Sequence, residues 1–248
     1  MIPWQKYLDR IYCIHYLPHR DRLQWLLSEL QRVGIAESGI FEWHYTFPSR
    51  WEQELHNIAY RRRWVRELGH TSLTLANYAI FKKALLLGYE RILILENDVA
   101  FLKDEAAIKH ILECIPYEYG MIQLDKLVFP KRAEFYRREK TERPINDCFF
   151  EAHYGYPFSD CNVWTRSGME KAVEFLDNRL IESDLITRYW GLPYAVAIRN
   201  MAVQIAYQDS SNVLRAPPGH WMGLYKISQQ SLVDYNLPEW IREICGMA

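Results

Sequence analysis

The sequence predicts an α/β protein built on a mainly parallel central sheet. Two observations lead to this prediction. A helical pattern over residues 71–87 runs directly into the unbroken apolar segment 92–95, and the apolar segment 11–14 is likewise followed by a helical pattern. An apolar run without alternation is typical of a strand that is buried on both faces of a parallel sheet. A chain of 248 residues is long enough to bury the core of such a domain.

The N-terminal part is predicted to be a strand, a polar turn and a helix. Residues 11–14 form the strand, and the helix follows from the i, i+3, i+4, i+7 spacing of Leu23, Leu26, Leu27, Leu30 and Val33. Asp21 is placed to cap the first turn of this helix, and Gly34 is placed to end it. Residues 41–68 mix aromatic and arginine side chains without one period, so we expect a loop and a helix there.

The central part is predicted to be a helix followed by two strands. The helix over residues 71–87 stops at Gly88 and carries an apolar stripe of Leu73, Ala76, Ile80, Ala84 and Leu87. Residues 92–95 form the first of the two strands. Residues 121–124 form the second, which ends at Asp125.

The C-terminal part is predicted to contain a loop, a helix and a late strand. Residues 149–158 are rich in aromatic side chains and are predicted to form the loop. Ser167 and Glu170 have the spacing of a capping box, which predicts a helix from this point through Leu176. Residues 203–206 predict the strand. Because no repeat, low-complexity tract or linker rich in Gly or Ser interrupts the chain, we expect a single domain.

Composition, charge and missing motifs exclude several classes of protein. Lys and Arg (30) nearly balance Asp and Glu (31), so the chain lacks the wide positive field of a nucleic-acid-binding protein. The five cysteines form no CxxC pair, which disfavours a disulfide framework and a zinc knuckle and favours a reducing compartment. No long apolar run or signal-like segment occurs, so we expect a cytoplasmic protein. No GxSxG, GxxxxGK or GxGxxG segment supports a serine hydrolase, P-loop ATPase or Rossmann dehydrogenase.

The strongest candidates for a functional site follow the predicted strand over residues 92–95. Ligands of open α/β sheets bind beyond the carboxyl ends of the strands, and Glu96, Asn97 and Asp98 stand at such an end. If the chain turns at Asn97, both carboxylates can approach a divalent cation, which prefers oxygen ligands. The alternative is an acidic pair that caps the next element or pairs with an arginine. His220 is a candidate third ligand, with an ordinary loop histidine as its alternative.

Several stretches of the sequence resemble glycosyltransferase family 25, which contains galactosyltransferases of lipopolysaccharide biosynthesis and of collagen. Residues 11–23 (IYCIHYLPHRDRL) are similar to the family's first strand and its arginine and aspartate-arginine segment. Residues 69–85 (GHTSLTLANYAIFKKAL) resemble a glycine-led helix that in the family also runs into a strand and an acidic triplet, here residues 93–99 (LILENDV). Residues 167–176 and the later Asp184 resemble a further helix and aspartate.

The resemblance implies a GT-A fold, a Rossmann-like nucleotide-binding α/β/α sandwich, over residues 1–248 as one domain. Residues 1–130 would bind the nucleotide sugar, and residues 131–248 would bind the acceptor. The implied activity is transfer of a hexose such as galactose from a UDP-sugar to a hydroxyl of a glycan or glycolipid, with inversion. In this fold an acidic triplet holds Mn²⁺ or Mg²⁺, which stabilises the charge that develops on the leaving diphosphate.

The resemblance also assigns a metal and a base to individual residues. Asp98 matches the strongest metal ligand, Glu96 binds the metal directly or through water, and His220 matches a C-terminal histidine that completes the coordination. Inversion needs a base that removes the proton of the acceptor hydroxyl. Asp184 is the first candidate for this base or for an acceptor anchor, and Asp160 is the second.

Further residues are candidates for contact with the substrates. Those implied to contact the nucleotide sugar and its metal are Arg20, Arg22, Asn77, Glu96, Asn97 and Asp98. Those that could stack on sugar rings are Trp164, Trp190 and Trp221. Asp125 is expected to shape the site from the neighbouring strand.

Two alternatives to a glycosyltransferase stay open. Ala76, Asn77 and Asn97 differ from the residues that are usual in the family, which favours a catalytically inactive GT-A module that binds a glycan or a partner. The other alternative is a nucleotidyltransferase on a similar sheet, which would consume a nucleoside triphosphate. The stretch 131–143 has six basic and three acidic side chains, which is typical either of peripheral contact with the cytosolic face of a membrane or of a solvated loop.

Overall fold

A computed structural model describes residues 1–16, 20–46, 53–54, 57, 68–125, 143–153, 161–178, 186, 193–204 and 234–236. The first half of the chain forms η1 (Trp4–Lys6), β1 (Arg10–Tyr16), α1 (Arg20–Arg32), β2 (Phe41–Thr46), α3 (Leu68–Leu86), β3 (Arg91–Glu96), β4 (Val99–Phe101), α4 (Glu105–Glu113) and β5 (Met121–Gln123). The second half forms β6 (Arg143–Pro144), β7 (Phe149–Ala152), β8 (Cys161–Thr165), α6 (Arg166–Asn178), β9 (Tyr194–Ala197) and β10 (Ala202–Gln204).

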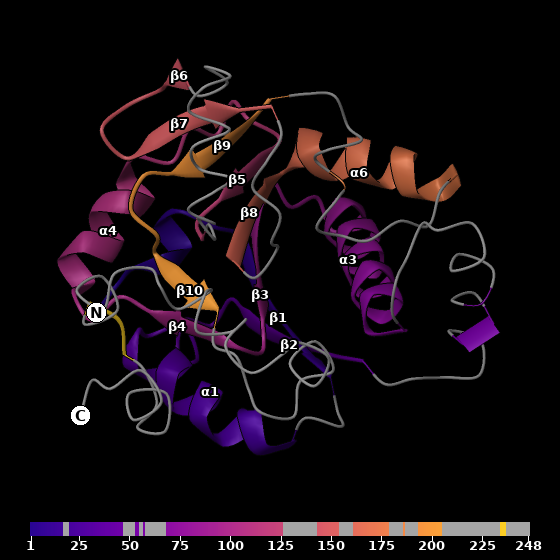
Figure 1. The fold of residues 1–248 in the computed structure, drawn as a ribbon, viewed down its shortest axis with the longest axis horizontal. Helices are drawn as coiled ribbons and strands as arrows, with labels where there is room; N and C mark the ends of the chain where they lie inside the picture. Colours follow the sequence, from indigo (N-terminus) through magenta and orange to yellow (C-terminus); the bar gives the residue numbers. More distant parts are fainter. Residues whose placement is uncertain are drawn as a thin grey trace, which may run out of the picture.

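The large sheet has the strand order β2-β1-β3-β8-β5-β9-β7-β6 (Figure 1). β1 pairs in parallel with β2 and β3, and β5 pairs in parallel with β9. β8 is antiparallel to β3 and β5, and β7 is antiparallel to β9 and β6. All strands except β8 and β7 therefore point the same way, which confirms the predicted α/β class with a mainly parallel sheet. β4 and β10 form a separate antiparallel pair.

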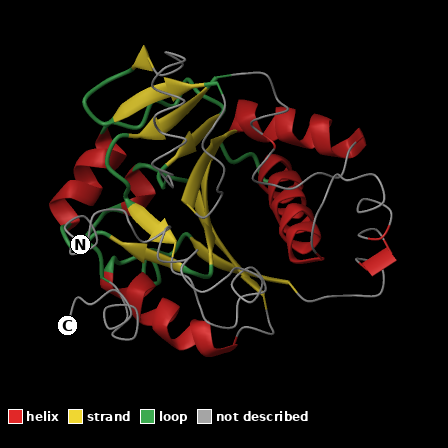
Figure 2. Cartoon of the chain, viewed as in Figure 1, coloured by secondary structure: helices red, strands yellow, loops and turns green. Residues whose placement is uncertain are grey.

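Helices cover both faces of the large sheet, which gives three layers (Figure 2). On one face α1 and α4 pack together with β4 and β10, and Leu26, Ile111 and Phe101 belong to this core. On the other face α3 and α6 pack against each other, and Ile80 and Met169 belong to the second core. The sheet is thus buried on both sides, as the unbroken apolar run of β3 predicts. Within the described residues no helix combines the length and apolar character needed to cross a lipid bilayer.

Two predicted helix ends are confirmed. Gly34 follows α1 with φ +74°, and Gly88 follows α3 with φ +75°, a region that favours glycine. The N–H of Ile35 donates to the carbonyl of Leu30 at 2.8 Å, five residues back, and the residues after Gly88 repeat this pattern. Both helices therefore end in a Schellman motif.

The predicted start of α1 and the predicted apolar stripes of α1 and α3 need correction. α1 begins at Arg20, so Asp21 lies inside the first turn and not before it. Leu26, Leu30 and Val33 are buried as expected, but Leu27 is exposed, and so is Leu87 beyond the end of α3.

Two segments that were expected to be loops are strands. The segment 41–68 was expected to hold only a loop and a helix, yet β2 occupies its beginning and pairs with β1. The period of two was present there, since Phe41, Trp43 and Tyr45 alternate with polar residues. β7 occupies the start of the expected aromatic loop 149–158, where tertiary pairing with β9 decides the conformation.

The predicted capping box is also wrong. Ser167 lies inside α6, which begins at Arg166, and the preceding Thr165 has the capping role. The Thr165 hydroxyl accepts from the N–H of Gly168 at 3.4 Å, while Glu170 accepts from Arg166 Nε at 3.1 Å instead of reaching back to the cap. The helix therefore begins two residues earlier than the spacing suggests.

Candidate functional site

The acidic segment Glu96-Asn97-Asp98 lies at the carboxyl edge of the sheet. β3 stops at Glu96, the chain turns through Asn97 and Asp98, and β4 begins at once in the second sheet. Glu96 is the register partner of Ile14, so β1 and β3 end side by side. The chain therefore turns at Asn97, which is the condition under which the carboxylates of Glu96 and Asp98 can approach one ion.

A buried histidine on β1 contacts this turn. His15 is 1% exposed, and its Nδ1 lies 3.2 Å from Nδ2 of Asn97. Because an amide nitrogen can only donate, the Nδ1 atom of His15 accepts this hydrogen bond. The His15 ring also packs edge-on against Trp43 at 6.1 Å and Tyr45 at 6.0 Å between ring centroids. Asn97 is thereby held between the ends of two strands.

The two carboxylates act electrostatically on one buried thiol. Asp98 is 8% exposed, while Glu96 is less buried. Burial raises the pKa of the Cys13 thiol well above its usual range, and the negative charges of Asp98 and then Glu96 raise that pKa further. Cys13 also lies 3.8 Å from the carbonyl oxygen of Glu96. Both carboxylates therefore contribute to a negative field at the strand ends, which favours a divalent cation.

Asp125 lies at the same edge, after β5. It is buried, and its Oδ1 accepts from the backbone N–H of Cys161 at 3.2 Å. The N–H of Leu124 in turn donates to the carbonyl of Cys161 at 2.9 Å. These two bonds fix the start of the antiparallel strand β8 to the end of β5. Asp125 thus positions the neighbouring strands.

A buried asparagine on β8 was missed by sequence reasoning. Asn162 is 1% exposed, and neither atom of its amide group has a hydrogen-bond partner within the described part of the chain. Asn162 is the register partner of Ile94 and therefore shares the sheet face of Ile94 and Glu96, two residues inside the edge. An unpaired buried amide costs about 1–3 kcal/mol, a cost that a polar ligand would remove. Its signal in the sequence is one amide inside the otherwise apolar segment 161–164.

The first half of α3 is polar although it is buried. Thr71, Ser72, Thr74 and Asn77 are all buried, whereas the second half of the helix buries Ile80 and other apolar residues. The C-terminus of α3 leads to the start of β3, so its polar half lies toward the carboxyl edge of the sheet. The Nδ2 atom of Asn77 donates to the Leu73 carbonyl at 3.0 Å, within the helix.

The remaining predicted residues divide into three groups. Arg20 and Arg22 lie in the first turn of α1, directly after β1. Trp164 is buried in the core against Phe81, at 4.7 Å between ring centroids, so the expectation that it stacks on a sugar ring is wrong. The residues that lie outside the described part of the chain are Asp160, Asp184, Trp190, His220 and Trp221.

Comparisons with known proteins complete the description. No protein-family model matches the chain, and no curated protein sequence matches it. A UDP-glucose pyrophosphorylase in complex with UDP-glucose superposes with a TM-score of 0.37 and 10% identity, over 76% of this chain and 90% of that chain. Mouse xyloside xylosyltransferase 1 in its apo form superposes with a TM-score of 0.36 and 10% identity, over 73% and 72%. Superpositions this loose assign no function, so the inference depends on the site residues.

Proposed function

We propose that this chain is a metal-dependent glycosyltransferase. It transfers a hexose, such as galactose, from a UDP-sugar to a hydroxyl of a glycan or glycolipid, with inversion. One observation carries the proposal: β3 ends in a tight turn that puts Glu96 and Asp98 at the carboxyl edge of a mainly parallel sheet, beside the end of β1. This edge is where open α/β sheets bind nucleotides. We place the reaction in the cytoplasm, at the cytosolic face of a membrane when the acceptor is a glycolipid.

The residues at this edge fit a hard divalent cation. Glu96 and Asp98 supply carboxylate oxygens, the ligands that Mn²⁺ and Mg²⁺ prefer. Burial, and then the charges of Asp98 and Glu96, raise the pKa of the neighbouring Cys13 thiol. A bound cation would stabilise the negative charge on the leaving diphosphate. His220 is the proposed C-terminal ligand.

The chain's own residues bind and orient the substrates. The His15–Asn97 contact holds the turn that carries Asp98. The buried amide of Asn162 offers a donor and an acceptor to a hydroxyl group of the donor substrate. Arg20 and Arg22, after β1, are proposed to contact the diphosphate.

The base belongs to the acceptor half of the chain. In an inverting transfer the acceptor oxygen attacks the anomeric carbon on the face opposite the nucleotide, and a carboxylate takes the proton of the attacking hydroxyl. Asp184 is proposed for this role, with Asp160 as the second candidate.

A ligand-dependent thermal unfolding experiment tests the proposal. We would measure the unfolding temperature with UDP, GDP and CDP, each with and without Mn²⁺, since a ligand that binds only the folded state raises it. UDP should stabilise the wild type only with Mn²⁺, and Asp98→Asn should abolish this shift while unfolding cooperatively. Glu90→Gln, which changes an exposed carboxylate away from the edge, should keep the shift.

The products of turnover separate the proposal from its alternatives. With a UDP-sugar and an acceptor, release of UDP that is lost in Asp98→Asn supports a glycosyltransferase. Release of pyrophosphate from a nucleoside triphosphate would instead indicate a nucleotidyltransferase. Sugar binding that is indifferent to Mn²⁺ and to Asp98→Asn would indicate an inactive binding module.

A further inference from the structure

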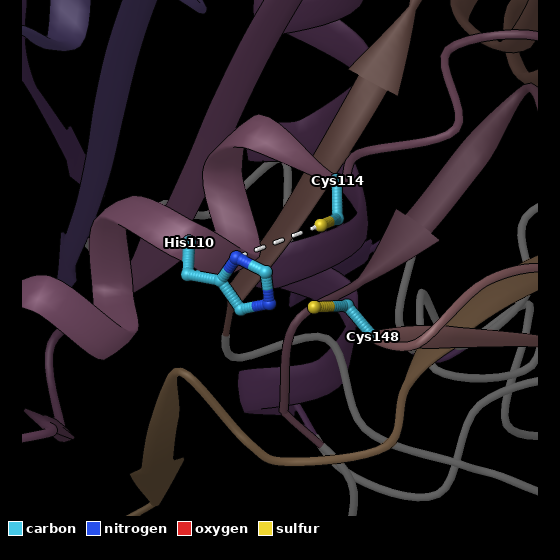
Figure 3. A group of neighbouring side chains, drawn as sticks. All are labelled: His110, Cys114 and Cys148. Carbon is cyan, nitrogen blue, oxygen red and sulfur yellow. Dashed lines mark hydrogen bonds between the residues drawn. The ribbon is translucent and has the colours of Figure 1, made fainter.

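Three side chains of types that can bind a metal ion lie close together, away from the carboxylates of Glu96 and Asp98. His110 belongs to α4, Cys114 caps the C-terminus of that helix, and Cys148 directly precedes β7 (Figure 3). Their ligand atoms all lie within 4.8 Å of one another. The Sγ atom of Cys114 lies 4.0 Å from Nδ1 of His110. Although the sequence shows no zinc-binding spacing, the fold therefore brings a histidine and two thiols together.

The backbone around this cluster is fixed by hydrogen bonds. His110 and Cys114 are four residues apart on one helical turn, which places both on the same face. Nδ2 of Asn146 donates to the Cys114 carbonyl, and Oδ1 of Asn146 accepts from the N–H groups of Cys148 and Phe149, each at 2.9 Å. The N–H of Ile198 also donates to the Cys148 carbonyl at 2.8 Å. The two sulfur atoms are therefore held opposite each other by the fold.

We propose that His110, Cys114 and Cys148 bind a zinc ion. Tetrahedral Zn²⁺ with bonds of about 2.0–2.3 Å places its ligand atoms roughly 3.5–3.8 Å apart, so the observed cluster needs only small side-chain movements. Cys148 is buried and His110 is exposed, so the fourth position faces solvent and takes a water molecule. The ion would tie the end of α4 to the start of β7.

The donor set separates this cluster from the carboxylate site. Thiolate and imidazole ligands select zinc over Mn²⁺ or Mg²⁺, which prefer oxygen. β7 is four strands from β3 in the sheet, a separation of about 19 Å at normal strand spacing. A disulfide between Cys114 and Cys148 would explain why the two sulfur atoms lie close together, but it would not explain the position of His110 beside them.

Titration with Co²⁺ tests the zinc site, because thiolate ligation gives a charge-transfer absorption that carboxylates do not give. Metal-free, reduced protein should bind one equivalent of Co²⁺ with this absorption, and Zn²⁺ should displace it and raise the unfolding temperature. Cys114→Ser and Cys148→Ser should each weaken the absorption, because only one thiolate remains, and His110→Ala should weaken Co²⁺ binding by at least about 10-fold.

Matched variants keep the result interpretable. His153→Ala removes a half-exposed histidine outside the cluster and should bind Co²⁺ as the wild type does. Asp98→Asn should also keep the absorption, which separates this site from the proposed catalytic one. Folded wild type without the absorption, or an absorption that persists undiminished in both cluster cysteine variants, would overturn the proposal. A Cys114–Cys148 disulfide in metal-free isolated protein would overturn it too.

Discussion

The side-chain amide of Asn97 donates to Nδ1 of His15 across 3.2 Å, so one hydrogen bond joins the ends of two parallel strands. The two residues are 82 positions apart in the chain. His15 is in turn packed against Trp43 and Tyr45 from the neighbouring strand. The acidic turn after β3 is therefore supported from β1 and β2 and not only by its own backbone.

Replacement of His15 should destabilise the fold. His15→Ala leaves the buried Asn97 amide without this acceptor and opens space beside two aromatic rings, so we expect a loss of about 1–3 kcal/mol in the free energy of unfolding. Urea denaturation measures this loss. His15→Gln retains an acceptor and should cost less, while His153→Ala, at a half-exposed side chain, should stay within about 0.5 kcal/mol of the wild type. Equal losses at the two histidines would contradict this view of the contact.

A buried glutamate on α1 connects distant parts of the chain. Glu29 is fully buried and accepts from Arg32 at 2.6 Å, from the N–H of Phe101 at 2.8 Å and from Nδ2 of Asn236 at 2.6 Å. Glu29→Ala leaves three donors without this acceptor, so we expect a loss of about 3–5 kcal/mol in urea denaturation. Glu113→Ala, at an exposed carboxylate, is the control and should cost under about 1 kcal/mol. A small loss for Glu29→Ala would show that water replaces the network.

A close backbone approach should make Gly168 intolerant of substitution. A Cβ atom there would lie 1.8 Å from the carbonyl oxygen of Gly120, a backbone atom that cannot rotate away. We expect Gly168→Ala to cost about 3 kcal/mol or more, because α6 must move from the sheet. Gly88→Ala, at φ +75° with nothing within 4 Å, should cost only about 1 kcal/mol of backbone strain. Thermal or urea unfolding of both variants should give this order, and the reverse order would refute it.

Stability should fall at high pH because of Tyr12. Burial, and then the charges of Glu42 and Tyr89, raise the pKa of Tyr12 to about 12 in the folded state. The unfolded chain releases this proton near pH 10, so the contribution is complete below about pH 10 and is lost as the pH rises toward 12. Tyr12→Phe should therefore lose less stability than the wild type between pH 8 and pH 11 in urea denaturation. An equally steep decline in both proteins would contradict the role of Tyr12.

The sequence alone determined the features that depend on local periodicity. The unbroken run of β3, the helical spacing of the apolar residues in α3 and the glycines that end α1 and α3 all predict what the structure contains. The position of Glu96, Asn97 and Asp98 at a strand end follows from the same pattern, because the end of an apolar run can be recognised from neighbouring residues alone. The short strands β2 and β7 did not follow, since pairing with neighbours stabilises them.

Tertiary structure alone decided which distant residues meet. No pattern in the sequence predicts that His15 contacts Asn97, that Asn162 is buried on the face of Glu96, or that Cys148 lies close to Cys114. Each of these contacts depends on strand order and register, which are set by how whole helices and strands bury their apolar faces. Local patterns carry no information about that packing, so the sequence determined the elements and the single acidic turn, and the fold decided the sites.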